Sequence, residues 1–115
     1  MPFEIRYFLF LKFKEFTQMF AVIFKAKPGI QDQEYGKTVA RMRELAFEKY
    51  GCIDFIAVTE GDQEVTISYW ETEEAIRQWK SDSEHSLAQD AGRNKWYESY
   101  TVQVVEIKRE YKFNE

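Results

Sequence analysis

The spacing of apolar residues changes from segment to segment along the chain. The order of these changes is the sequence feature that most restricts the fold. Residues 20–25 are almost entirely apolar, as in a buried strand, and Pro28-Gly29 ends this segment. Over residues 31–50 the apolar side chains recur instead at helical spacing, and Gly51 follows as a helix stop. The regular structure therefore begins with a strand followed by a helix.

The second half of the chain repeats this alternation after a predicted hairpin. Residues 52–59 and 65–70 both have strand-like patterns, and the turn-forming pair Gly61-Asp62 separates them. Thr72 caps a helix with acidic residues in its first turn, and residues 97–108 form a last strand. The predicted order is β-α-β-β-α-β, the ferredoxin-like α+β arrangement in which both helices cover one face of a four-stranded antiparallel sheet.

The other face of this sheet would be bare in a single chain. The second strand is apolar on both sides: one side carries Ile53, Phe55 and Ala57, and the other carries Cys52, Ile56 and Val58. A strand that is apolar on both faces usually has both faces covered. The apolar positions of the last strand also change phase after Val104, which predicts a bulge there. We therefore expect a homodimer that pairs sheet against sheet.

A predicted break in the second helix determines the surroundings of the only histidine. Ser81-Asp82-Ser83-Glu84 has the pattern of a capping box, so we expect the helix to end after Lys80 and another to begin near Asp82. His85 then lies in a first helical turn, where the positive end of the helix dipole favours the neutral imidazole. A neutral imidazole can accept a proton at neutral pH.

Length and composition limit the possible classes of function. The 115 residues suffice for one domain with a core, and a net charge of -4 argues against DNA or RNA as a partner. Cys52 is the only cysteine, so no intrachain disulfide is possible, and we expect a reducing, cytoplasmic location. The chain has no glycine-rich phosphate-binding motif, and one histidine with one cysteine do not make a conventional zinc site. We expect no metal and no nucleotide cofactor.

Residues 1–18 precede the predicted domain, which we place at residues 19–115. Apolar side chains occupy every second position from Phe3 to Phe13, which would suit an additional strand. The apolar run Tyr7-Phe8-Leu9-Phe10-Leu11 is too short for a membrane span, which takes about 20 apolar residues. We expect no membrane segment, and the extension is either an added edge strand or a loosely packed segment.

A series of short motifs in the second half of the chain carries a family resemblance. The motifs are Val65-Thr66-Ile67-Ser68-Tyr69-Trp70, Glu74-Ala75-Ile76, Trp79-Lys80, Glu84-His85, Ala88-Gln89, Gly92-Arg93 and Trp96-Tyr97. Together they resemble the antibiotic biosynthesis monooxygenase domain family over residues 19–113, and most of all a stand-alone, largely uncharacterised bacterial branch. The resemblance implies a dimeric α+β barrel, a pocket between helices and sheet, and in some members oxygen chemistry without metal or flavin. The same scaffold also carries haem-degrading enzymes and proteins with no known activity.

For an oxygenase without a cofactor, His85 is the candidate catalytic base. Such an enzyme must deprotonate a phenolic or activated C–H group so that the anion can give an electron to oxygen, and a neutral histidine suits that step. The alternative is a structural histidine that packs or hydrogen-bonds at the start of its helix, and the sequence supports both equally.

Aromatic side chains and one arginine are the candidate substrate-binding residues. Trp70 alternates with polar residues of its strand, and from that position it would line a pocket. Trp79 and Trp96 would stack on an aromatic substrate or else fill the core. Arg93 would bind a substrate carboxylate or oxyanion, although a surface salt bridge is the commoner role.

The haem-degrading members of the family provide a second possible function. They carry an asparagine in the first strand, where we place Phe24, and take their iron-ligating histidine from a position near Gln89. His85 lies one helical turn earlier. These differences argue against haem, and haem binding would then require His85 to reach the iron from its own turn. Phe24 is a further candidate substrate contact. Three functions stay open: a cofactor-independent monooxygenase of small phenolic or polycyclic aromatic compounds, a haem-binding or haem-degrading protein, and a non-catalytic dimeric ligand-binding module.

Overall fold

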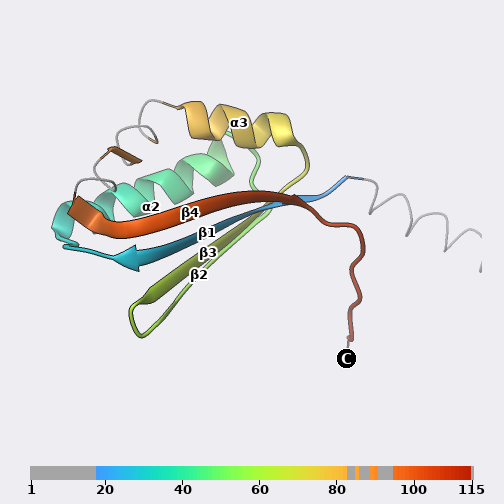
Figure 1. Cartoon of the computed structure of the whole chain (residues 1–115). Helices are drawn as coiled ribbons and strands as arrows, with labels where there is room; N and C mark the ends of the chain where they lie inside the picture. The colour runs from blue at the N-terminus through green and yellow to red at the C-terminus, as the bar shows by residue number, and fades with distance from the viewer. Residues whose placement is uncertain (1–17, 83–84, 86–88, 91–94, 115) are drawn as a thin grey trace, which may run out of the picture.

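The computed structural model describes residues 18–82, 85, 89–90 and 95–114. Its elements are β1 (Phe20–Pro28), α2 (Gln33–Glu48), β2 (Asp54–Glu60), β3 (Gln63–Trp70), α3 (Glu73–Ser81) and β4 (Tyr97–Glu106). The strands form one antiparallel sheet in the order β2-β3-β1-β4 (Figure 1). This arrangement confirms the predicted ferredoxin-like α+β fold. The strand expected within residues 1–18 lies outside the described residues.

Caps and glycines account for where the elements begin and end. The side chains of Asp32 and Thr72 each accept a hydrogen bond from a backbone N–H of the following helical turn, at 3.0 and 3.1 Å. Gly51 after α2 and Gly61 between β2 and β3 have φ values of 76° and 58°, which favour a residue without Cβ. Three of these four positions are the turn and cap signals seen in the sequence.

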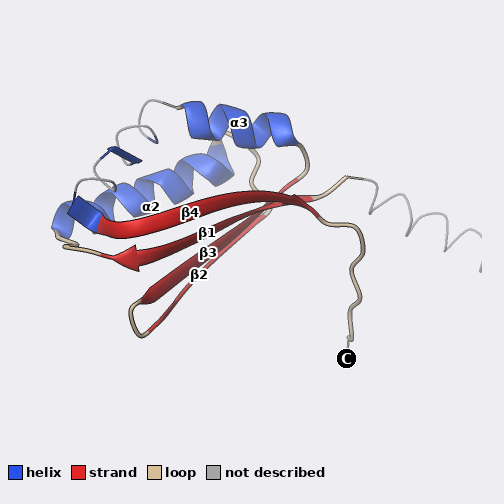
Figure 2. Cartoon of the chain, viewed as in Figure 1, coloured by secondary structure: helices blue, strands red, loops and turns tan. Residues whose placement is uncertain are grey.

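Both helices cover the same face of the sheet (Figure 2). On this face β1 contributes Val22, which is paired with Ser68 of β3 and Val104 of β4. The core lies between this face and the helices, around two tryptophans. It contains Val22, Met42, Leu45, Ala46, Cys52, Trp70, Ile76 and Trp79. No helix in the described part of the chain is both long and apolar enough to cross a membrane.

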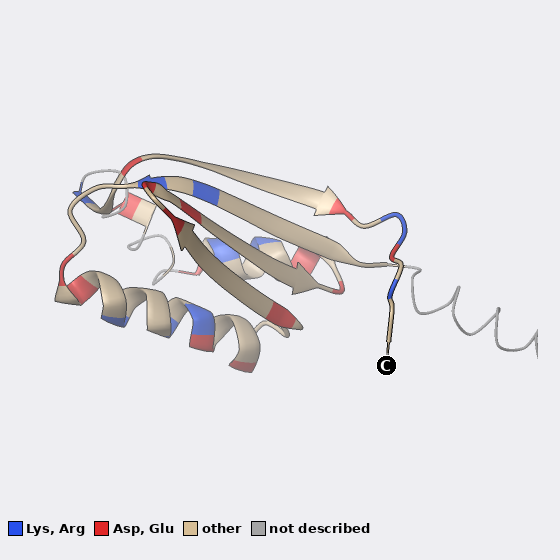
Figure 3. Cartoon of the chain, turned by 90° about the horizontal axis from the view of Figure 1, so that it is seen from below, with Lys and Arg blue, Asp and Glu red and all other residues tan. Residues whose placement is uncertain are grey.

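The opposite face of the sheet is open and largely apolar. Ile56 and Val58 of β2 are 45% and 57% exposed on it, so β2 is apolar on both faces as predicted. Most charged residues of the strands lie near the strand ends, and Lys25 within β1 is the exception on this face (Figure 3). This open face is the surface that a sheet-to-sheet dimer would bury.

Two details predicted for the strands are wrong. The register of β1 with β4 shifts between Lys27 and Pro28, and no bulge follows Val104. The apolar pattern changes phase there because Val104 lines a cavity under the helices, whereas Val105 belongs to the open apolar face. Cys52 precedes β2 and is buried in the core on the helix side, so it does not share the face of Ile56.

Candidate functional site

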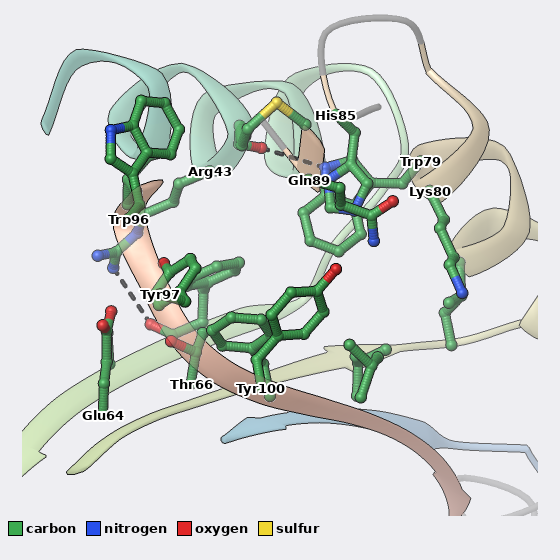
Figure 4. A pocket seen from close by; sticks show the side chains of 18 of the residues that line it. Arg43, Glu64, Thr66, Trp79, Lys80, His85, Gln89, Trp96, Tyr97 and Tyr100 are labelled. Carbon is green, nitrogen blue, oxygen red and sulfur yellow. Dashed lines mark hydrogen bonds between the residues drawn. The ribbon is translucent and has the colours of Figure 1, made fainter. Parts of the chain in front are cut away.

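A cavity lies between the sheet and the two helices (Figure 4). All four strands, both helices and the segment after α3 contribute to its wall, which is mostly aromatic and aliphatic. Polar side chains occupy two ends of it, with His85 and Gln89 at one and Glu64 and Tyr97 at the other. A largely apolar cavity with a few placed polar groups is the usual form of a small-molecule site.

The structure brings several of the predicted site residues together on this wall. They are Phe24 of β1, Trp79 of α3, His85, and Trp96 next to β4. These residues are far apart in the sequence, and the fold gathers them around one space. Their contact with a substrate stays a prediction. Arg93 lies outside the described residues.

Trp70 does not line the cavity, contrary to the expectation for this residue. Its side chain is 0% exposed, and its indole Nε1 donates a hydrogen bond to Ser68 Oγ at 2.8 Å. Strand alternation correctly predicts that Trp70 faces the same way as Ser68. The ring of Trp79 packs against it at 5.2 Å between centroids, and Trp79 takes the place on the cavity wall.

Trp79 also shapes the surroundings of His85. The Trp79 Nε1 donates to the Met42 carbonyl at 3.2 Å, which ties α3 to α2. The rings of Trp79 and His85 lie 4.5 Å apart between centroids, at 45°. The Nδ1 atom of His85 is buried and has no hydrogen-bond partner among the described residues. Buried polar atoms are usually paired, so this nitrogen is available to a group that enters the cavity.

Burial lowers the pKa of His85 from 6.5 to about 4, and the positive charge of Lys80 acts in the same direction. Asp82 opposes this shift. The imidazole is therefore neutral at neutral pH, as predicted, with desolvation as the main cause. The helix α3 ends at Ser81, one residue later than expected, and His85 is again helical. Two of the four capping-box residues, Ser83 and Glu84, lie outside the described residues.

A chain of hydrogen-bonded side chains forms the other polar end of the cavity. The hydroxyl oxygens of Tyr97 and Tyr35 lie 3.1 Å apart, and Tyr35 donates to Glu64 Oε1 at 2.8 Å. Burial raises the pKa of Tyr97 to about 12 and also raises the pKa of Tyr35, to which the two hydrogen bonds add. Both phenols therefore keep their protons at neutral pH.

This polar end was not predicted from the sequence. Glu64 has the same strand phase as Ser68, so alternation alone would have placed it on the helix face of the sheet. Tyr35 and Tyr97 belong to elements that meet only in the folded chain, and the sequence carries no signal of their contact.

Trp96 is held at the cavity by the chain that follows β1. Its carbonyl accepts a hydrogen bond from the Gly29 N–H at 2.7 Å, and its ring meets that of Tyr35 edge-on at 5.5 Å. A Cβ atom on Gly29 would lie 2.6 Å from the Lys95 carbonyl oxygen, so this close approach requires glycine.

The cavity does not carry the residues that the family resemblance implies for haem. Phe24 and Gln89 line it at the two positions where that resemblance implies an asparagine and a ligating histidine. Within the described ranges, no three His, Cys, Asp or Glu side chains come together as a metal site would require. Glu64 has a carboxylate that could serve as a metal ligand, but this carboxylate already accepts a hydrogen bond from Tyr35.

Similarity to known proteins points to one family. The sequence profile described as antibiotic biosynthesis monooxygenase matches residues 19–91. An uncharacterized protein of Bacillus subtilis, YqjZ, is 39% identical over 97 residues, which covers 84% of this chain and 85% of that protein. A jasmonate monooxygenase of Pyricularia oryzae is 27% identical over 101 residues, covering 84% of this chain but 47% of the fungal protein.

Solved structures share the fold at low sequence identity. SnoaB, a cofactor-independent oxygenase from Streptomyces nogalater, has a TM-score of 0.65 and 15% identity, with 86% of this chain and 100% of that chain covered. Rv0793 from Mycobacterium tuberculosis has a TM-score of 0.67 and 13% identity, with 82% and 99% covered. Likeness at this level establishes the arrangement of helices and strands, while the chemistry depends on the residues in the cavity.

Proposed function

The chain belongs to the antibiotic biosynthesis monooxygenase family, and from this premise we propose that it is a cofactor-independent monooxygenase of small phenolic or polycyclic aromatic compounds. The observation that carries the proposal is the state of His85, a neutral imidazole whose buried Nδ1 lacks a partner among the described residues and borders an aromatic cavity. A base in such a place can meet a substrate proton without competition from the protein.

The proposed reaction begins when His85 takes a proton from an activated C–H or phenolic O–H group. The anion gives one electron to O₂, and the two radicals join as a peroxide on a ring carbon. The imidazolium returns its proton to the peroxide, and loss of water from a carbon that bears a second hydrogen leaves a carbonyl. In sum CH₂ + O₂ becomes C=O + H₂O, and the substrate supplies all the electrons that reduce oxygen.

The low pKa of the free imidazole is compatible with its role as a base. An anion that forms beside the ring favours the charged imidazolium, because opposite charges attract strongly in an apolar cavity. The pKa of His85 therefore rises as the substrate loses its proton. Trp79, Trp96 and Phe24 would hold a flat ring in place while this happens.

We further propose that the protein is a homodimer joined through the open face of the sheet. The exposed apolar side chains of Ile56, Val58 and Val105 support this, because a contiguous apolar surface of this kind usually marks an interface. Light scattering should give twice the chain mass. A single-chain mass in dilute solution would refute the dimer and leave the site chemistry unaffected.

Oxygen uptake over a panel of quinols and anthrones tests the function. We expect turnover by the wild type, a roughly 10²- to 10⁴-fold lower rate for His85→Ala, and an unchanged rate for the control Lys37→Ala on the exposed side of α2. Unchanged uptake in His85→Ala would remove His85 from the mechanism. Binding of ring compounds without uptake would identify a ligand-binding module instead, and a sharpened Soret band on titration with haemin would favour haem.

A further inference from the structure

We propose that the end of the cavity remote from His85 recognises a hydrogen-bond donor on the ligand, such as a phenolic hydroxyl, through the oxygen atoms of Tyr97 and Glu64. The aromatic nature of the ligand rests on the proposed function, but the polarity of this end follows from the hydrogen bonds of the protein alone. The site selects against ligands that present only an acceptor there.

The Glu64 carboxylate determines the direction of the hydrogen bonds at this end. An ionised carboxylate can only accept, so the Tyr35 hydroxyl, 2.8 Å from Oε1, donates to it. A phenol has one hydrogen, and Tyr35 can therefore only accept from Tyr97 at 3.1 Å. The hydrogen of Tyr97 is used in that bond. Its oxygen is left with lone pairs, and a ligand group that binds there must donate.

The residues that carry the two acceptors lie on the cavity wall. Tyr97 and Glu64 both line it, whereas Tyr35 supports them from α2 and does not line it. The ring of Tyr97 is held in place by Phe24 at 5.2 Å and by Tyr35 at 5.9 Å, both nearly perpendicular to it. The hydroxyl of Tyr97 is therefore set by ring packing as well as by its hydrogen bond.

The spacing of the two polar ends indicates an elongated ligand. Glu64 and Ser68 lie on the same face of β3, and the partner of Ser68 on β2 is Phe55, which packs against Trp79 beside His85. Ser68 follows Glu64 by four positions on β3, which corresponds to about 13 Å along the strand. Figure 4 shows Glu64 and Tyr97 across the cavity from His85. With this offset along β3, a fused polycyclic ring with a hydroxyl at its far end extends between the two ends better than a single ring does.

Arg43 provides the competing interaction on this wall. It lines the cavity from α2, its Nη2 donates to the Phe55 carbonyl at 3.2 Å, and its guanidinium lies 5.3 Å from the centre of the Phe55 ring. If Arg43 rather than Tyr97 governed binding, a ligand with an acceptor or an anion would be preferred. The two possibilities therefore predict opposite ligand selectivity.

Calorimetric titration with 2-naphthol and 2-methoxynaphthalene separates them, because the two probes share a ring system and differ in the ability to donate. We expect wild type to bind the naphthol roughly tenfold more tightly, the effect of one net hydrogen bond of about 1.4 kcal/mol. Tyr97→Phe keeps the ring but removes one of the two acceptors, so it should lower the preference. Equal binding of the two probes by the wild type, or tighter binding of the methoxy compound, would overturn the proposal.

The variant Tyr35→Phe provides a sharper test. Loss of the Tyr35 hydroxyl frees the hydrogen of Tyr97 to point into the cavity, so the methoxy probe should gain affinity and the preference should fall to about one or reverse. Retention of the full preference in both Tyr variants would overturn the proposal. His85→Ala should keep the preference, which excludes binding of the naphthol hydroxyl at His85 as its origin. Oxygen uptake is a separate readout: a protein with the preference but no turnover would refute only the proposed function.

Discussion

Acidification should destabilise the folded protein through His85. Burial lowers the pKa of this imidazole in the folded state to about 4, against 6.5 for the ordinary group. Between these two pH values the unfolded chain binds a proton that the folded protein does not. The free energy of unfolding therefore rises with pH across this window, and the stability present above pH 6.5 is lost as the pH falls towards 4.

The magnitude follows from the size of the pKa shift. One pKa unit corresponds to about 1.4 kcal/mol, and a shift from 6.5 to about 4 gives roughly 3 kcal/mol. The imidazole is only partly buried, and solvent screening reduces this to about 2 to 3 kcal/mol. A change of this size is a large fraction of the stability of a domain of this length.

The assay benefits from the composition of the chain. His85 is the only histidine, so its ring protons form a single titrating set in an NMR spectrum and need no assignment. We expect a midpoint near pH 4. Urea unfolding gives the free energy of unfolding at pH 4 and at pH 7 for wild type and for His85→Gln. The change in this free energy between the two pH values should be about 2 to 3 kcal/mol smaller in the variant.

Two results would refute this account of His85. A midpoint near 6.5 would mean that the ring is solvated, and its Nδ1 would then not be reserved for a substrate. An identical pH dependence in wild type and His85→Gln would assign the acid sensitivity to other groups.

Further predictions concern the framework of the site and the reaction. The change Gly29→Ala should lower the free energy of unfolding by about 1 to 3 kcal/mol, because its Cβ would meet the Lys95 carbonyl, whereas Gly36→Ala in α2 meets no atom within 4 Å and should stabilise by about 0.5 to 1 kcal/mol. Trp70→Ala should cost about 3 to 5 kcal/mol in urea unfolding, since it empties a fully buried site. Val58→Glu on the open face should halve the mass measured by light scattering while leaving the unfolding transition cooperative. In the proposed enzyme, kcat/KM should fall with decreasing pH around pH 4 rather than around pH 6.5. A fall centred on the ordinary histidine pKa would contradict the role of His85 as base.

Much of the fold is determined by the sequence because its signals are local. Hydrophobic periods identify a strand or a helix within one segment, and caps such as Thr72 and turns such as Gly51 and Gly61 depend on neighbouring backbone atoms alone. The neutral state of His85 also followed from the sequence, although its main cause in the structure is burial rather than the helix dipole invoked there. Compartment and the role of residues 1–18 stay predictions.

The tertiary structure decided which side chains the cavity contains. Strand alternation shows which face Trp70 occupies, but not that α3 would lay Trp79 over it and bury it completely. In the sequence, the change of phase at Val104 resembles a bulge. In the structure the register is unbroken there, and Val104 and Val105 belong to two different apolar surfaces. The hydrogen bonds between Tyr97, Tyr35 and Glu64 join residues 62 and 29 positions apart. The periodicity of a segment predicts the direction in which a side chain leaves its own backbone. The residues that this side chain contacts depend on where the other helices and strands pack.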